Sequence, residues 1–151
     1  MLKSRFISAA LLVVALLMTS GCAVNRATGM LTPGTDLAKV KTFYVVKAPT
    51  DGNKIDELIK AQLVSKGFAV TVGPEQTIPY KADAVVTYID KWMWDLSMYM
   101  IELTITLRDP TSNFPMAVGN SFHTSLSRKS PEAMVDEVLG NIFTAPKPAN
   151  Q

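Results

Sequence analysis

The chain has 151 residues, which is the size of one ordinary domain. Its 15 lysines and arginines nearly balance 13 aspartates and glutamates and are scattered, which argues against a nucleic-acid-binding protein. One cysteine excludes a fold stapled by disulfides, and one histidine argues against a zinc site. These counts describe a domain that packing alone must hold together.

The first 21 residues have the architecture of a secretory signal peptide. Lys3 and Arg5 form a basic start, and residues 7–18 (ISAALLVVALLM) form an apolar run. The run is too short to span a bilayer, which needs about 20 apolar residues. We expect residues 1–21 to be removed, so that the 13 remaining basic residues equal the 13 acidic ones and the net charge is zero.

Residues 19–22 read Thr-Ser-Gly-Cys and resemble the lipobox of bacterial lipoproteins, although Thr19 stands where that family favours leucine. The resemblance implies that Cys22 carries lipid and that the chain is cut before it. Ala23 lacks the negative charge that retains such proteins at the inner membrane. We therefore expect a lipoprotein of a Gram-negative bacterium, anchored by Cys22 in the outer membrane and facing the periplasm.

Residues 22–36 show no periodic apolar pattern, and Gly29 and Pro33 interrupt any regular element. We interpret this stretch as the lipidated cysteine and a tether; an extended segment packed along the domain is the alternative. A single domain is expected over residues 37–144, and residues 145–151 are expected to be a disordered tail.

Two elements are predicted in the first half of the domain. Residues 42–46 (TFYVV) are rich in β-formers and predict a strand. Apolar positions recur at helical spacing over residues 54–66, which predicts an amphipathic helix. Asn53 is its expected N-cap, and Gly67 its expected left-handed end.

Four further strands are predicted, over residues 68–72, 84–94, 99–108 and 116–126. The clearest is 99–108, where large apolar side chains at the odd positions alternate with mostly polar ones, so one face should be buried. Gly119 is a candidate β-bulge.

A second helix is predicted to begin at Pro131, with Ser130 as its N-cap and an apolar stripe behind it. The element order is then βαββββα. Short connections favour an antiparallel meander, and both amphipathic helices need an apolar surface. We expect an α+β fold: a two-layer sandwich whose mostly antiparallel sheet of about five strands carries both helices on one face.

No convincing catalytic constellation appears. His123 shares a strand face with Ser121 and Ser125, but strand neighbours rarely meet at attack geometry. Asp90 and Asp95 bracket two tryptophans, as paired carboxylates do in sugar-cleaving sites, yet they differ in strand parity. We predict no catalytic residue, no cofactor and no metal site.

The most unusual stretch is residues 92–100 (WMWDLSMYM), which holds both tryptophans and three of the eight methionines around one predicted hairpin. Large apolar side chains of this kind either fill the gap between sheet and helices or form an adaptable contact surface. If the hairpin projects beyond the helices, Trp92, Trp94, Met98 and Tyr99 become the candidate partner-binding residues.

Four short patterns lie between residues 90 and 139: DKWMWD at 90–95, Met98-Tyr99, Arg108-Asp109, and SRKSP at 127–131. In this combination the chain resembles a group of small uncharacterised proteobacterial outer-membrane lipoproteins. The element order is also similar to the sheet-and-helix domains of the curli-secretion lipoprotein and of the TolB amino-terminal domain. That second likeness concerns fold alone.

The expected function is therefore that of a lipid-anchored periplasmic module without enzymatic activity, which binds an envelope protein or glycan in envelope assembly or maintenance. One alternative is a subunit of a secretion or transport assembly, which should form a ring. Another is a glycan-acting enzyme that uses Asp90, Asp95 or His123.

Overall fold

The structure, a computed structural model, describes residues 25–147, so the predicted signal peptide and Cys22 lie outside the described residues. Within this range the chain forms six strands, two α-helices and two 3₁₀ turns. In chain order they are β1 (Arg26–Leu31), η1 (Leu37–Lys39), β2 (Thr42–Val46), α2 (Ile55–Ser65), β3 (Ala69–Gly73), β4 (Ala84–Asp95), β5 (Ser97–Arg108), β6 (Pro115–Phe122), η2 (Ser125–Ser127) and α3 (Pro131–Thr144). Neither helix of this part of the chain is long and apolar enough to cross a bilayer.

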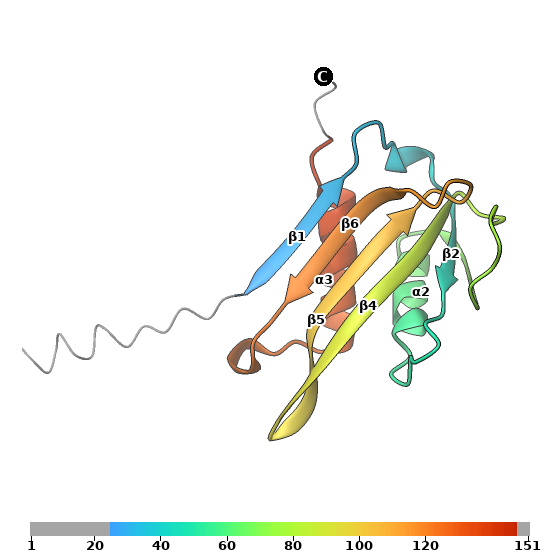
Figure 1. The fold of residues 1–151 in the computed structure, drawn as a ribbon. Coiled ribbons are helices and arrows are strands. Elements are labelled where there is room, and N and C mark those ends of the chain that lie inside the picture. Colours follow the sequence, from blue (N-terminus) through green and yellow to red (C-terminus); the bar gives the residue numbers. More distant parts are fainter. Residues whose placement is uncertain (1–24, 148–151) are drawn as a thin grey trace, which may run out of the picture.

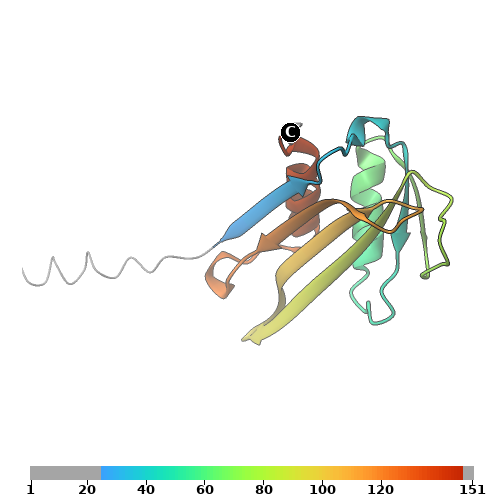
Figure 2. The same cartoon turned by 45° about the horizontal axis from the view of Figure 1, so that its top comes forward.

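All six strands belong to one sheet, in the order β1-β6-β5-β4-β2-β3. The pairs from β1 to β4 are antiparallel, whereas β2 runs parallel to both β4 and β3. Helices α2 and α3 lie side by side on one face, and the other face carries no helix (Figures 1 and 2). This two-layer arrangement confirms the expected α+β fold, with six strands in place of about five.

The additional strand is β1, and over residues 26–31 it agrees with the alternative of an extended segment packed along the domain rather than with a tether. Residues 26–31 pair with β6 from Arg26 opposite Phe122 to Leu31 opposite Ala117. Backbone hydrogen bonding therefore orders a segment whose own side chains are mostly exposed. Between Cys22 and the sheet only residues 23–25 remain.

The first helix begins differently from the prediction. Lys54, with φ of 58°, is the N-cap residue of α2, and no side chain caps the helix from that position. Instead the carboxylate of Asp51 accepts hydrogen bonds from the backbone N–H groups of Asn53, at 2.8 Å, and Asp56, at 3.2 Å. Asn53 is thus a donor to this cap rather than the cap itself. The left-handed Gly67 after the helix, with φ of 91°, is confirmed.

The core lies between the helices and the covered face of the sheet. Its fully buried large side chains come from both layers: Phe43, Val45, Ile55, Ile59, Leu63, Met100, Leu103, Ile105, Leu107, Met134, Leu139 and Ile142. The N-cap of α3 is confirmed, because the Ser130 hydroxyl accepts the N–H of Ala133 at 3.2 Å.

Two paired glycines let α3 approach the sheet closely. Gly29 of β1 stands opposite Gly119 of β6. A Cβ at Gly29 would lie 2.3 Å from the carbonyl oxygen of Asn141, and one at Gly119 would lie 2.7 Å from Val138 Cγ1. The predicted bulge at Gly119 is therefore wrong, since the register is regular there and the glycine makes room for the helix. Strand β6 also ends earlier than predicted, at Phe122, and η2 begins at Ser125.

Candidate functional site

The histidine and serine singled out in the sequence meet a carboxylate. The Ser121 hydroxyl donates to Glu137 Oε2 at 2.6 Å, and His123 Nε2 lies 2.8 Å from the same oxygen. Lys129 Nζ lies 2.5 Å from the other oxygen, Oε1. Ser121 and His123 thus both contact the same oxygen of Glu137 instead of hydrogen-bonding to each other. Ser125 lies in η2. The arrangement fastens the end of β6 to α3.

The electrostatics of Glu137 agree with that structural role. Partial burial alone would raise its pKa, but hydrogen bonds from Lys129, Ser121 and His123 outweigh burial and lower the pKa to about 2. A carboxylate held this firmly in its charged form is a poor proton donor at neutral pH. His123 Nδ1 is buried without a hydrogen-bond partner, so that nitrogen faces no substrate-accessible space.

The two aspartates also serve local structure. Asp90 accepts the indole N–H of Trp92 at 2.5 Å. Asp95, at the end of β4, is paired with Arg128, whose guanidinium lies 3.3 Å from its carboxylate. No cluster of three or more metal-binding side chains occurs among residues 25–147. The structure therefore does not bring Asp90, Asp95 and His123 together around one cleft.

The hairpin formed by β4 and β5 contains an irregularity that the sequence did not reveal. Lys91 pairs with Glu102 but Trp92 pairs with Met100, which leaves Ile101 as an extra residue. This bulge reverses the alternation, so Met100 joins the core together with Leu103. The expectation that all odd positions of 99–108 share the buried face is wrong on the tip side of the bulge.

The four candidate partner-binding residues are divided by this geometry. Trp92 is half-buried against the core, and Tyr99 is buried beneath the guanidinium of Arg128, 4.3 Å from its ring centre. Trp94 and Met98, which pair with each other, are 71% and 60% exposed. The hairpin projects beyond both helices (Figure 1). Trp92 and Tyr99 are therefore packed within the domain, and only Trp94 and Met98 are available for contact.

A second feature is a cleft at the carboxyl end of β2. Strand β2 pairs with β4 only along Ala84–Val86, so residues 87–95 of β4 have β5 on one side and no strand of the described chain on the other. Two adjoining hollows surround this point, and they share Val46, Glu75, Thr87 and Tyr88. We call them together the β2-end cleft.

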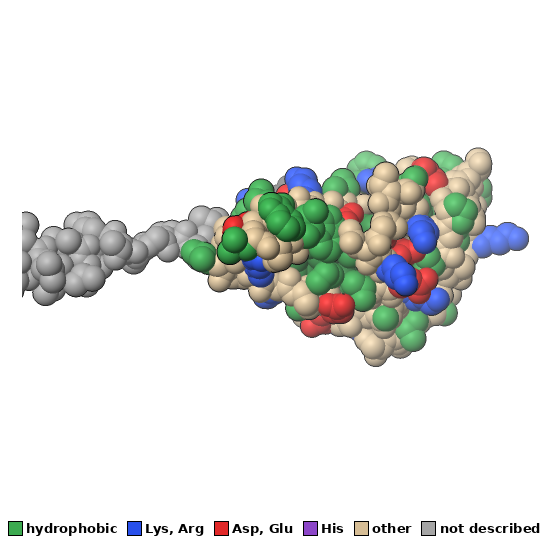
Figure 3. Space-filling model, turned by 90° about the horizontal axis from the view of Figure 1, so that it is seen from below, with side chains coloured by type: hydrophobic (Ala, Val, Ile, Leu, Met, Phe, Trp, Pro, Cys, Tyr) green, Lys and Arg blue, Asp and Glu red, His purple; other side chains and the backbone are tan. Residues whose placement is uncertain are grey.

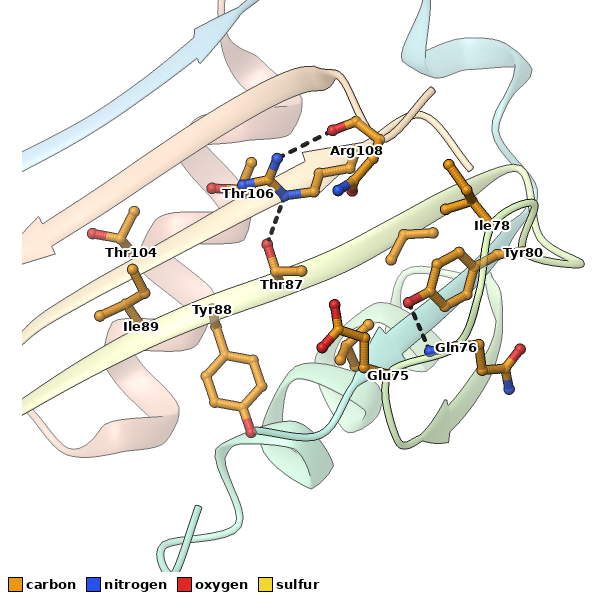
Figure 4. Close-up of a pocket in the computed structure, with 13 residues that line it drawn as sticks. Glu75, Gln76, Ile78, Tyr80, Thr87, Tyr88, Ile89, Thr104, Thr106 and Arg108 are labelled. Carbon is orange, nitrogen blue, oxygen red and sulfur yellow. Dashed lines mark hydrogen bonds between the residues drawn. The ribbon is translucent and has the colours of Figure 1, made fainter. Parts of the chain in front are cut away.

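The hollow on the open face of the sheet has a volume of about 370 Å³. Arg108 crosses its floor, where Nε donates to Thr87 Oγ1 at 3.1 Å and a terminal nitrogen donates to the carbonyl oxygen of Asn113 at 3.1 Å (Figure 4). Threonines 104 and 106 of β5 continue this polar floor, and Tyr80 and Gln76 stand at its side. Hydroxyl, amide and guanidinium groups thus line it, with Ile78 and Ile89 supplying apolar contact.

The hollow on the helix side is larger, at about 610 Å³. The Tyr88 hydroxyl donates to Asp51 at 2.6 Å, and burial together with this hydrogen bond raises the pKa of Tyr88. Asp56 is almost fully buried, faces Lys47 Nζ at 3.8 Å and leaves Oδ1 without a hydrogen bond. The phenol of Tyr88 in this polar wall therefore stays protonated at neutral pH.

No local pattern in the sequence marks this cleft, because its residues come from β2, the loop after β3, β4 and β5. One signal was present: the predicted strand at 42–46 is much shorter than that at 84–94, and neighbouring strands of unequal length leave an unpaired edge.

No protein-family profile matches the sequence, and no curated protein matches it either. Among solved structures, the PelC dodecamer from Paraburkholderia phytofirmans superposes with a TM-score of 0.59 at 14% identity, over 79% of this chain and 98% of that chain. A PDZ domain protein from Parabacteroides distasonis gives 0.50 at 12% identity, over 85% of this chain and 38% of that one. TolB from Acinetobacter baumannii gives only 0.42 at 14% identity, over 79% and 31% of the two chains. The first two likenesses concern the fold.

Proposed function

We propose that this protein is a lipid-anchored module of the outer membrane, without enzymatic activity, that faces the periplasm and binds another envelope component. The lipobox at residues 19–22 supports the anchor. The observation that carries the binding role is the unpaired edge of β4 over residues 87–95, beside the β2-end cleft.

An extended segment of another envelope protein fits this edge in two ways. Its backbone can hydrogen-bond to the open side of β4, as in recognition by strand addition. Its alternate side chains can enter the hollow over Thr104, Thr106 and Arg108. Strand addition needs an accessible edge. Ile89, which is exposed at the cleft end of this stretch, offers apolar contact, and the charged residues Asp90, Lys91 and Asp95 follow towards the hairpin turn.

The test is retrieval of partners from crosslinked cell envelopes with the full-length protein. Ile89→Asp places a charge on the free edge and should abolish retrieval. Val64→Asp is the matched control, because Val64 is an exposed apolar residue of α2, away from the edge. Equal retrieval by both variants, or no partner with the unaltered protein, would contradict the binding role. Acyl chains on Cys22, read by mass spectrometry, test the anchor separately.

A second candidate function is a subunit of a secretion or transport assembly. The likeness of fold to PelC, which crystallised as a dodecamer, motivates it. This function requires the acylated protein to form a ring in detergent, and sedimentation that showed a monomer at high concentration would exclude it.

A further inference from the structure

The outer end of the β4–β5 hairpin is an apolar surface that packing within the domain does not explain. Trp94, Leu96 and Met98 are 71%, 94% and 60% exposed, and Met93 beside them is about half exposed. Leu96 also has φ of 58°, a conformation that glycine or asparagine normally supplies in a hairpin turn. A leucine there has an unfavourable backbone conformation, and its apolar side chain is exposed to water. A contact outside the domain accounts for it best. We call Trp94, Leu96 and Met98 the hairpin tip.

The base of the tip is held by several contacts of one side chain, Arg128. Arg128 donates to the Ser97 hydroxyl at 2.7 Å and to the carbonyl oxygen of Asp95 at 2.7 Å. The same guanidinium covers the ring of Tyr99. One side chain from the η2 connection therefore braces both strands of the hairpin directly behind the tip. An apolar projection that is already held in place loses little conformational entropy when it makes a contact outside the domain.

The tip points in the direction from which the chain enters the domain. Arg26, Phe122, Glu102 and Lys91 stand in one register row across β1, β6, β5 and β4. Beyond that row the hairpin continues for four residues to Asp95, which is about 13 Å. Both the start of β1 and the hairpin tip lie at this end of the sheet (Figures 1 and 2).

The length of chain before β1 limits where the lipid can be. Cys22 is four residues before Arg26, so even a fully extended chain places it within about 14 Å of the register row. That limit nearly equals the projection of the hairpin. A chain extended along the direction of β1 therefore allows a bilayer that holds acyl chains on Cys22 to lie at the level of the tip.

A further apolar side chain marks the same end. Leu126 of η2 is 92% exposed, and the neighbouring Ser127 hydroxyl is hydrogen-bonded to the side chain of Asn25, where the described chain begins. Viewed from this end, hydrophobic side chains gather on the surface (Figure 3). Two of the acidic groups nearby are paired with cations, Asp95 with Arg128 and Glu102 with Lys91, and the carboxylate of Asp90 accepts the indole N–H of Trp92, which reduces the negative charge that opposes contact with lipid.

We propose that the hairpin tip inserts into the interfacial layer of the membrane that holds the lipid anchor. This inference rests on the proposed anchoring through Cys22. Tryptophan is favoured at membrane interfaces, and peripheral contact of this kind grows with the apolar area buried. The lipid and the tip then fix the domain at two points, which sets its orientation as well as its location.

Tryptophan quenching by brominated lipids tests the insertion. The full-length protein is expressed with its signal peptide, purified, and reconstituted into vesicles of neutral phosphatidylcholine with brominated acyl chains. In Trp92→Phe the sole tryptophan is Trp94, and we expect its emission to shift to the blue and to lose intensity. In Trp94→Phe the half-buried Trp92 should keep its emission. A Trp94 that is equally bright in brominated and ordinary lipid overturns the proposal.

A second comparison avoids any change to the core. Leu96→Asp, with both tryptophans present, should reduce the quenching. Phe114→Asp should leave quenching unchanged, because Phe114 is 64% exposed but belongs to the β5–β6 connection at the opposite end of the sheet. Equal quenching in the two variants overturns the proposal.

Two other results would also overturn it. Quenching that requires anionic lipid and disappears in salt would indicate electrostatic adsorption rather than insertion. Crosslinks through position 94 to a second copy or to another protein, without quenching, would give the tip a protein partner. Acylated Cys22 with an unquenched Trp94 contradicts only the insertion, whereas an unmodified Cys22 contradicts the anchored module itself.

Discussion

At the carboxyl end of β6, one carboxylate holds side chains from two other segments of the chain. Glu137 of α3 accepts hydrogen bonds from Ser121, His123 and Lys129. The sequence drew attention to the histidine and the serines because those residue types do chemistry. It gave no reason to select Glu137, which lies 14 residues beyond His123 and reaches it only because α3 folds back across the sheet.

Replacing Glu137 should destabilise the fold in a pH-dependent way. Its pKa is about 2 in the folded protein against 4.5 ordinarily, so its contribution is complete above pH 4.5 and is lost as the pH falls towards 2. Glu137→Gln should lower the free energy of unfolding at pH 7 by about 2 kcal/mol. Denaturant unfolding at several pH values should also show a shallower acid loss in this variant.

Glu132→Gln on the same helix is the control, since Glu132 stands in its exposed first turn. An equal loss of stability in both variants, or an unchanged acid profile in Glu137→Gln, would contradict the assigned role of Glu137.

Asp51 holds together the start of α2 and the wall of the β2-end cleft. Burial alone would raise its pKa, but hydrogen bonds from Tyr88 and from backbone N–H groups lower it. Asp51→Ala should cost about 1–3 kcal/mol, because the Tyr88 hydroxyl and the N–H groups of α2 lose their acceptor. Chemical denaturation measures the loss. Asp136→Ala, an exposed aspartate of α3, should cost much less.

At the scale of elements, the sequence predicts those strands and helices that carry their own periodic apolar pattern. Strands β2, β4 and β5 and both helices appear near their expected bounds because burial of one face selects them. Strand β1 (RATGML) has no such pattern, since its side chains are mostly exposed. It exists because β6 offers a free edge, and only the tertiary structure shows that edge.

The β4–β5 hairpin is a second place where the sequence pattern does not determine the structure. The alternation in residues 99–108 correctly indicates a half-buried strand, but a single extra residue, Ile101, reverses the faces beyond it. Which large side chains of the Trp-Met stretch are core and which are exposed depends on that bulge. The position of the hairpin relative to the helices likewise depends on strand order, which the sequence left open.

The packing of α3 against β1 depends on Gly29. Gly29→Ala would place a methyl group 2.3 Å from the carbonyl oxygen of Asn141, so either the strand or the helix must move. We expect a loss of about 1–3 kcal/mol, measured by thermal or chemical unfolding. Gly52→Ala is the matched control, since open space surrounds that position and it has no left-handed φ. Equal stability of the two variants would show that β1 is not pressed against α3.

At the scale of the whole molecule, two surfaces lie at different levels along one strand. Thr87 lines the β2-end cleft and Asp95 stands at the hairpin turn, eight residues later on β4, which corresponds to about 26 Å. If the tip enters the bilayer, the cleft is held above it in the aqueous phase. A tether of three residues then serves to present the cleft at a fixed height rather than to give the domain freedom.

This arrangement predicts an order of distances from the membrane. The chain has one cysteine, and lipid occupies it in the proposed protein, so a second cysteine can be labelled uniquely. A donor fluorophore at Leu96→Cys should transfer energy most strongly to acceptors in the lipid headgroups. Transfer should be weaker from Glu75→Cys beside the cleft and weakest from Phe114→Cys at the far end. Similar transfer from all three positions would mean that the domain tumbles on its anchor and that the hairpin tip does not hold this end of the sheet against the bilayer.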